Sequence, residues 1–201
     1  MFVYLFTYDF SRNIKYTKGV ELVHMVLRLG SCLITIKVKW RRRKTMASVF
    51  DVAKYILHEI GTVTTWKLQK LVYYCQAWSL VWDDEPLFEE DFQAWANGPV
   101  CPELFRKHSG MYRVREEDIE GDIDGFTQSQ RETMDAVLEH YGDKEPYWLR
   151  ELTHEEDPWK EARGNCGPGE KCTNTISKSS MQIYVLLQPE IWGSKKPRVI
   201  L

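Results

Sequence analysis

Apolar positions recur with helical spacing most regularly between residues 64 and 83. One apolar seam steps by three and four residues through Leu68, Leu71, Cys75, Trp78 and Trp82. A second apolar stripe consists of Trp66, Tyr73, Ala77 and Leu80. The polar side chains fall into one narrow strip, Gln69, Gln76, Ser79 and Asp83. This pattern predicts a helix that is apolar over most of its circumference, and therefore a central helix surrounded by other elements.

A second helix is predicted just upstream, over residues 49–60. Ser48 is a good N-cap, Asp51 lies in the first turn where an acid favours the helix dipole, and Gly61 supplies a stop. Two helices joined by the short GTVTT turn also resemble a helix-turn-helix. A DNA-reading second helix keeps a polar, basic face for the bases, however. The segment 64–83 lacks such a face, which argues against DNA recognition.

Shorter elements follow the central helix. Residues 88–95 are interpreted as a short strand at a sheet edge, and Asn97-Gly98-Pro99 as a turn. The charged segment 110–125 is interpreted as a loop or weak edge strand. Further helices are predicted over residues 102–108, 127–141, 146–156, 157–163 and 178–187. We therefore predict an α+β fold that is predominantly α-helical, with helices packed around the central helix and a small antiparallel sheet.

Charge is distributed unevenly along the chain. Residues 1–45 contain ten Lys and Arg against two acids, whereas the remainder contains 17 basic and 27 acidic residues. An acidic body repels phosphates, so any nucleic-acid binding would come through the basic arm 37–44. Because residues 1–45 share neither charge nor periodicity with the body, we interpret them as an N-terminal extension and place the native start at Met46. Residues 46–188 then form one domain, and residues 189–201 a C-terminal tail.

The cysteines and the apolar segments bear on the cellular setting. The five cysteines form no CxxC pair and follow no secretory signal, which indicates free thiols in a reducing, cytoplasmic environment. The apolar stretch 20–38 contains four charged or titratable side chains, Glu21, His24, Arg28 and Lys37. This stretch falls short of a clean membrane span, and we expect no membrane partner.

The sequence offers two alternative kinds of catalytic site. The acidic run 89–91 could contribute to a carboxylate pair, but neighbouring residues of a strand alternate faces and cannot all converge on one substrate. A hydrolase nucleophile could be drawn from Cys101 with His108, or from Cys75 with His58. Cys75 lies on the apolar seam of the central helix and is expected in the core, which leaves Cys101 as the alternative nucleophile.

A metal site was also considered. His154, Cys166 and Cys172 are separated by twelve and six residues, which matches no common zinc site, and a fourth ligand is missing. We therefore predict no catalytic residue, no cofactor and no metal. The eight tryptophans exceed what a small core needs, and exposed Trp and Tyr beside charges favour protein–protein contact.

Five segments between Met46 and about Gln188 together resemble the Panacea domain family, which includes SocA-like and phage-associated GepA-like proteins. They are VFDVAKYIL, TTWKLQKLVYYCQAWSLVW, PLFEEDFQAWANGPVCPELF, LTHEEDPWKEAR and PGEKCTNTISKSSMQIY. The resemblance implies a non-enzymatic antitoxin that neutralises a co-encoded toxin by binding it. In the SocA branch it implies an adaptor that delivers the toxin to a ClpXP-type protease.

We expect the toxin to contact an aromatic surface of this domain, since an acidic antitoxin suits a basic toxin. We expect the interface around residues 95–100 and on the side of the central helix that bears Trp66 and Tyr73, which is expected to be exposed. The predicted partner-binding residues are Trp66, Tyr73, Trp95, Asn97, Gly98, Pro99 and Val100.

Overall fold

The computed structural model describes residues 15–17, 20–29, 32–40 and 46–187. The chain divides into two compact units, Met1–Thr45 and Met46–Leu201. In the first unit, an antiparallel sheet joins β1 (Lys15–Thr17), β2 (Val20–Leu29) and β3 (Cys32–Trp40). The predicted basic arm 37–44 lies partly on β3, and its residues 41–44 fall outside the described residues. The predicted tail 189–201 also falls outside them.

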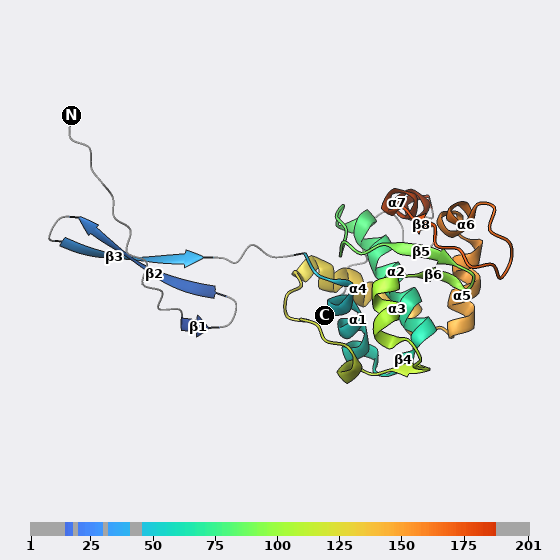
Figure 1. Cartoon of the computed structure of the whole chain (residues 1–201), viewed down its shortest axis with the longest axis horizontal. Helices are drawn as coiled ribbons and strands as arrows, with labels where there is room; N and C mark the ends of the chain where they lie inside the picture. The colour runs from blue at the N-terminus through green and yellow to red at the C-terminus, as the bar shows by residue number, and fades with distance from the viewer. Residues whose placement is uncertain (1–14, 18–19, 30–31, 41–45, 188–201) are drawn as a thin grey trace, which may run out of the picture. The chain divides into compact units, whose positions relative to one another are not determined.

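The second unit is mainly helical with short strands, so the predicted fold class is confirmed (Figure 1). Its elements are α1 (Val49–Ile60), β4 (Val63–Thr64), α2 (Thr65–Trp82), β5 (Phe92–Trp95), β6 (Gly98–Val100), α3 (Pro102–His108), β7 (Arg113–Val114), the 3-10 turn η1 (Glu116–Asp118), α4 (Gln128–Tyr141), α5 (Pro146–Glu155), α6 (Asp157–Arg163), β8 (Thr175–Ile176) and α7 (Lys178–Leu186). No helix in the described part of the chain is long and apolar enough to cross a membrane.

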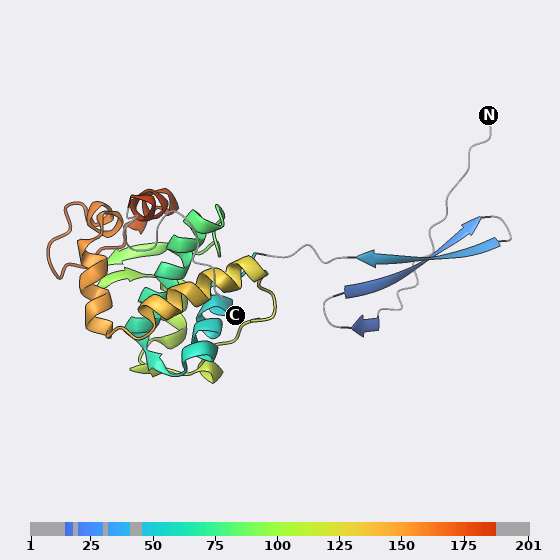
Figure 2. The same ribbon diagram turned by 180° about the vertical axis from the view of Figure 1, so that it is seen from behind.

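The helix α2 lies at the centre of this unit, as its apolar pattern predicts. It packs against α1, α3, α4, α5 and α7, and Figure 2 shows α4 crossing on the near side. Leu68, Leu71 and Cys75 of the apolar seam are fully buried. The ring of Tyr74 stacks on that of Tyr141 in α4, with centroids 4.3 Å apart. Burial on almost every side explains why α2 has no polar face of the kind a surface helix needs.

The polar strip of α2 is also buried, and it binds the backbone of the segment that follows the helix. Gln76 accepts hydrogen bonds from the amides of Leu87 (2.9 Å) and Phe88 (3.2 Å) and donates to the Phe88 carbonyl (3.0 Å). Ser79 donates to the carbonyl of Glu85 (2.9 Å). Backbone groups that are removed from water need such partners. The polar side chains of α2 therefore hold an irregular chain segment against the core.

The small sheet differs from the prediction in position and length. The strand predicted over residues 88–95 is shorter, and β5 is the central strand of the antiparallel order β6-β5-β8. It is not an edge strand, because β8 arrives from far along the sequence to pair with it. The predicted turn at residues 97–99 is also shifted: Trp95 pairs with Gly98, so residues 96–97 form the hairpin loop. Pro99 lies in the edge strand β6, so the absence of an N–H group at this position removes no hydrogen bond between strands.

The predicted helix starts are confirmed by their cap geometry. The Ser48 side chain accepts from the Asp51 amide while the Asp51 carboxylate accepts from the Ser48 amide, which makes a capping box. Thr127, the first residue of the predicted helix 127–141, is the N-cap of α4, and Ser177 caps α7 directly before the predicted helix 178–187. Gly61 ends α1 with a φ of 74°, a conformation that glycine adopts without strain.

Candidate partner-binding site

A pocket of about 280 Å³ opens where the first turn of α2, the β5–β6 hairpin and α3 meet. Its walls are largely aromatic. The ring of Trp95 packs edge-on against Phe105, with centroids 4.8 Å apart, and Trp66 remains 51% exposed at the rim. Val100 adds aliphatic surface. Aromatic side chains around a concave apolar surface are typical of anchor sites for a partner's side chain.

The floor of the pocket is polar and internally hydrogen-bonded. Gln69 lies between Cys101 and His108: it accepts from the Cys101 amide (2.8 Å) and its amide group approaches His108 Nε2 at 2.9 Å. Burial lowers the pKa of His108, so the ring is neutral and its Nε2 can accept this bond. The floor therefore presents a fixed set of hydrogen-bonding groups with no charge on the imidazole.

Lys70 also reaches the pocket floor, although its side chain is almost fully buried. Its Nζ donates to the carbonyl of Pro99 at 3.0 Å. Burial and, to a smaller extent, the nearby Arg150 lower the pKa of Lys70 to about 7. A Cβ at Gly98 would lie 2.7 Å from Lys70 Cε and Nζ, so only glycine lets the hairpin approach the lysine this closely.

A buried carboxylate lies near Lys70 behind the pocket. Glu156 accepts from the hydroxyl of Tyr74 at 2.7 Å, and the hydroxyl of Tyr73 also bonds to it. Burial raises the pKa of Glu156 to about 7, against the opposing effect of these hydrogen bonds and of Lys70. The hairpin that carries Trp95 and Val100 is thus supported from behind by a set of buried, mutually dependent polar groups.

The third wall comes from the loop between α6 and β8. Lys171 and Cys172 of this loop line the pocket. Arg163 at the end of α6 is buried and donates to the carbonyls of Gly167, Glu170 (3.2 Å) and, in β5, Ala94 (3.1 Å). One guanidinium therefore joins the loop to the central strand of the sheet.

Residues 68–160 match the family described as "Antitoxin SocA-like, Panacea domain". This part of the chain is similar to the Panacea domain. The matched range runs from the first turns of α2 into α6 and includes the hairpin and α3, so most of the pocket lies within it. Trp66 and the loop residue Lys171 lie just outside. No curated protein and no solved structure matches the chain.

The family resemblance drawn from the sequence is thereby confirmed. The match to a SocA-like antitoxin family supports an antitoxin role in general and favours a non-enzymatic one. The domain boundaries predicted at residues 46 and 188 extend beyond the matched range on both sides and stay predictions.

Four of the seven predicted partner-binding residues come together in this pocket of the Panacea domain. They are Trp66, Trp95, Asn97 and Val100. Asn97 is exposed and accepts a weak bond from Arg150 Nε at 3.4 Å. Gly98 and Pro99 are buried behind the pocket, where they contact Lys70.

The expectation that Tyr73 is exposed beside Trp66 was wrong. Tyr73 is 1% exposed, and its ring packs edge-on against Phe92 of β5 at 5.3 Å. Trp66 and Tyr73 share one apolar stripe of the helix, but Trp66 lies in the exposed first turn of α2, whereas Tyr73 lies in the buried middle of the helix. The side of α2 that bears Tyr73 is covered by β5, so a partner cannot reach its side chain.

The alternative nucleophile of the Panacea domain lacks the features of an activated thiol. Burial raises the pKa of the Cys101 thiol to about 12, and its Sγ lies 3.5 Å from a carboxylate oxygen of Glu103. His108 bonds to Gln69 and makes no hydrogen bond to Cys101. A catalytic cysteine needs a lowered pKa and a base within reach. The structure supplies neither at Cys101.

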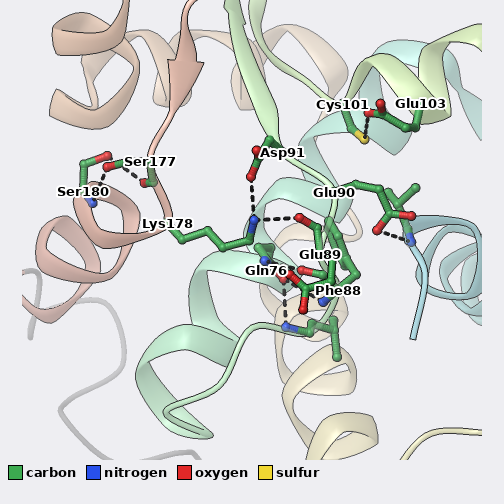
Figure 3. A network of polar contacts seen from close by, with 12 residues as sticks. Gln76, Phe88, Glu89, Glu90, Asp91, Cys101, Glu103, Ser177, Lys178 and Ser180 are labelled. Carbon is green, nitrogen blue, oxygen red and sulfur yellow. Dashed lines mark hydrogen bonds and ion pairs between the residues drawn. The ribbon is translucent and has the colours of Figure 1, made fainter. Parts of the chain in front are cut away.

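The acidic run 89–91 has structural partners elsewhere in the second unit, as Figure 3 shows. Lys178 of α7 donates to the Glu89 carbonyl (2.8 Å) and to the Asp91 carboxylate (2.6 Å). The Glu90 carboxylate accepts from the Val49 amide in the first turn of α1 at 3.3 Å. Two of the three carboxylates therefore join separate elements, and they are not directed at one point as a catalytic pair would be.

The group His154, Cys166 and Cys172 also separates in the structure. His154 stacks on Trp159 with centroids 4.1 Å apart, whereas the two cysteine sulfurs face each other 2.7 Å apart. Within the described residues, no group of three or more His, Cys, Asp or Glu side chains could hold a metal ion.

Most of the other residues that line the pocket were not predicted from the sequence. Phe105 and His108 lie on α3, the short helix that follows the β5–β6 hairpin. Their spacing of three residues could have suggested that they share one face of this helix. Lys171 and Cys172 carry no sequence signal, because they reach the pocket only through the pairing of β8 with β5.

Proposed function

We propose that this Panacea domain protein neutralises a co-encoded toxin by binding it directly at the aromatic pocket. The observation that carries the proposal is the convergence of exposed and half-buried aromatic side chains, Trp66 and Trp95, around a concave surface in an antitoxin-family domain. Such surfaces supply much of the binding energy in protein interfaces.

The pocket is suited to a single apolar side chain of the toxin. Its aromatic walls are fixed by packing, and its floor of Gln69, Lys70 and His108 is already hydrogen-bonded. A preformed pocket loses little conformational freedom when it is filled. Around it, the acidic body would accelerate association with a basic toxin.

Co-expression with the neighbouring gene tests this proposal. The unaltered chain should restore growth of cells that express the toxin and should retain it in a pull-down. Trp66→Ala should reduce toxin affinity by about 30-fold, which corresponds to the loss of one interface hot spot. Because Trp66 is half exposed, this change should leave the fold intact.

Trp148→Ala provides the matched control. Trp148 is 43% exposed, lies on α5 and does not line the pocket. Its replacement should leave growth rescue and the pull-down unchanged. If Trp66→Ala and Trp148→Ala lost growth rescue and toxin binding to the same extent, or both retained them, binding at the pocket would be contradicted.

The same cells distinguish sequestration from proteolytic delivery. If the chain sequesters the toxin, toxin abundance stays constant or rises when the chain is present. If it acts as an adaptor, as in the SocA branch, toxin abundance falls and recovers in cells that lack a ClpXP-type protease. We propose sequestration as the simpler activity, since a pocket for one side chain accounts for it.

A further inference from the structure

Two thiols face each other on the loop that forms the third wall of the pocket. Cys166 Sγ and Cys172 Sγ lie 2.7 Å apart. Cys172 is buried and lines the pocket, whereas Cys166 is partly exposed. The disulfide bond length is about 2.05 Å, so a shift of less than about 1 Å would bring the sulfurs to bonding distance.

The loop holds the two thiols in place from both sides. The Arg163 guanidinium binds loop carbonyls, including that of Glu170 at 3.2 Å. Downstream, Asn174 donates to the Ala162 carbonyl (2.9 Å) and its own carbonyl accepts from the Ala94 amide (2.9 Å). The ends of the loop are therefore fixed to α6 and β5, and the sulfurs meet without a large rearrangement.

From this geometry we infer that Cys166 and Cys172 form a reversible disulfide that rigidifies one wall of the pocket. The other two cysteines of this unit offer a contrast. Cys75 and Cys101 are fully buried, with 0% of each side chain exposed. They lie on separate elements and have no cysteine partner among the described residues.

Thiol–disulfide exchange with glutathione disulfide supplies the oxidant. The more exposed Cys166 thiolate attacks one glutathione sulfur, which forms a mixed disulfide and releases one glutathione thiolate. The Cys172 thiolate then attacks Cys166 Sγ and displaces the second glutathione. Two cysteine thiols are thus oxidised, one glutathione disulfide is reduced to two glutathiones, and both thiol protons pass to solvent or to the leaving thiolates.

Closing this seven-residue ring restricts the segment that carries Lys171. The chain-closure relation predicts that opening of the loop becomes about 50-fold less favourable. Amides that exchange through this opening should exchange about 50-fold more slowly after oxidation. The consequence for toxin binding rests on the function proposed above, but disulfide formation and the change in exchange do not.

The experiment uses the full chain with Cys32→Ser, incubated at alkaline pH in glutathione buffers of increasing oxidised fraction. Trypsin cleaves after Lys171 and so separates the two cysteines into peptides 164–171 and 172–178. The expected product under oxidising conditions is a cross-link between these peptides, which dithiothreitol reverses. Glutathione on Cys166 without the cross-link would overturn the inference.

Hydrogen exchange followed by mass spectrometry supplies the second readout, with Cys166→Ser as the matched control. Cys166 does not line the pocket, so this variant keeps the pocket residues. In the chain that keeps both Cys166 and Cys172, oxidation should slow amide exchange in segment 166–172. In the Cys166→Ser variant, oxidation should leave this exchange unchanged. A cross-link that forms without slowing exchange would also overturn the inference. Neither readout requires a toxin, so failure here is distinguishable from failure of the proposed function.

Discussion

Gly98→Ala tests the close approach of the hairpin to Lys70. Gly98 has a φ of +97°, which costs an L-residue about 1–2 kcal/mol. The new Cβ would also lie 2.7 Å from Lys70 Cε and Nζ and 2.8 Å from Thr153 Oγ1. The lysine can move only by giving up its 3.0 Å bond to the Pro99 carbonyl.

The magnitude follows from these two contributions. A hydrogen bond to a charged group contributes about 1.5–3 kcal/mol, so together with the backbone strain we expect Gly98→Ala to lower the free energy of unfolding by about 2.5–5 kcal/mol. Gly110→Ala is the matched control, because Gly110 has a φ of +86° but a Cβ there meets nothing within 4 Å. It should cost only the backbone strain of about 1–2 kcal/mol.

Equilibrium urea unfolding, followed by tryptophan fluorescence and far-ultraviolet circular dichroism, measures both variants. The midpoint of Gly98→Ala should fall well below that of Gly110→Ala at similar denaturant dependence. Equal destabilisation of the two variants would refute the argument that Lys70 requires a glycine at this position.

Two further changes probe the buried polar groups. Gln76→Leu leaves the backbone groups of Leu87 and Phe88 unpaired, so urea unfolding should show a loss of about 3 kcal/mol or more; a loss below about 1 kcal/mol would contradict this. Glu156 has a folded pKa of about 7, above its ordinary 4.5. Its contribution to stability is therefore present below pH 4.5 and lost as pH rises through 7. This loss amounts to about 3 kcal/mol, and Glu156→Gln should remove most of it in urea unfolding curves measured across that pH range. An unchanged dependence of the free energy of unfolding on pH would refute the raised pKa of Glu156.

The helices of the second unit could be predicted from the sequence because their signals are local. Apolar spacing of three and four residues marks α2, and Ser48 occupies the cap position that determines where α1 begins. The polar strip of α2 was recognised as well. Its partners were not, because side-chain bonds to the backbone depend on how segment 85–101 folds back onto the helix.

The predictions that were wrong concern contacts between segments that are far apart in the sequence. β5 was expected at a sheet edge, but β8, about eighty residues later, pairs with it and makes it central. The burial of Tyr73 has the same origin, since its neighbour Phe92 belongs to β5. Part of the candidate site, including Trp66 and Trp95, could be proposed from aromatic content, whereas Cys172 reaches the pocket only through tertiary structure. Periodicity carries no information on such pairings.

The affinity of the purified chain for its co-encoded toxin, measured by calorimetry with Trp66→Ala and Trp148→Ala in parallel, tests the central claim most directly. The account predicts about 30-fold weaker binding for Trp66→Ala and unchanged binding for Trp148→Ala, with both variants as stable as the unaltered chain. Undiminished affinity of Trp66→Ala for the toxin would contradict binding at the aromatic pocket.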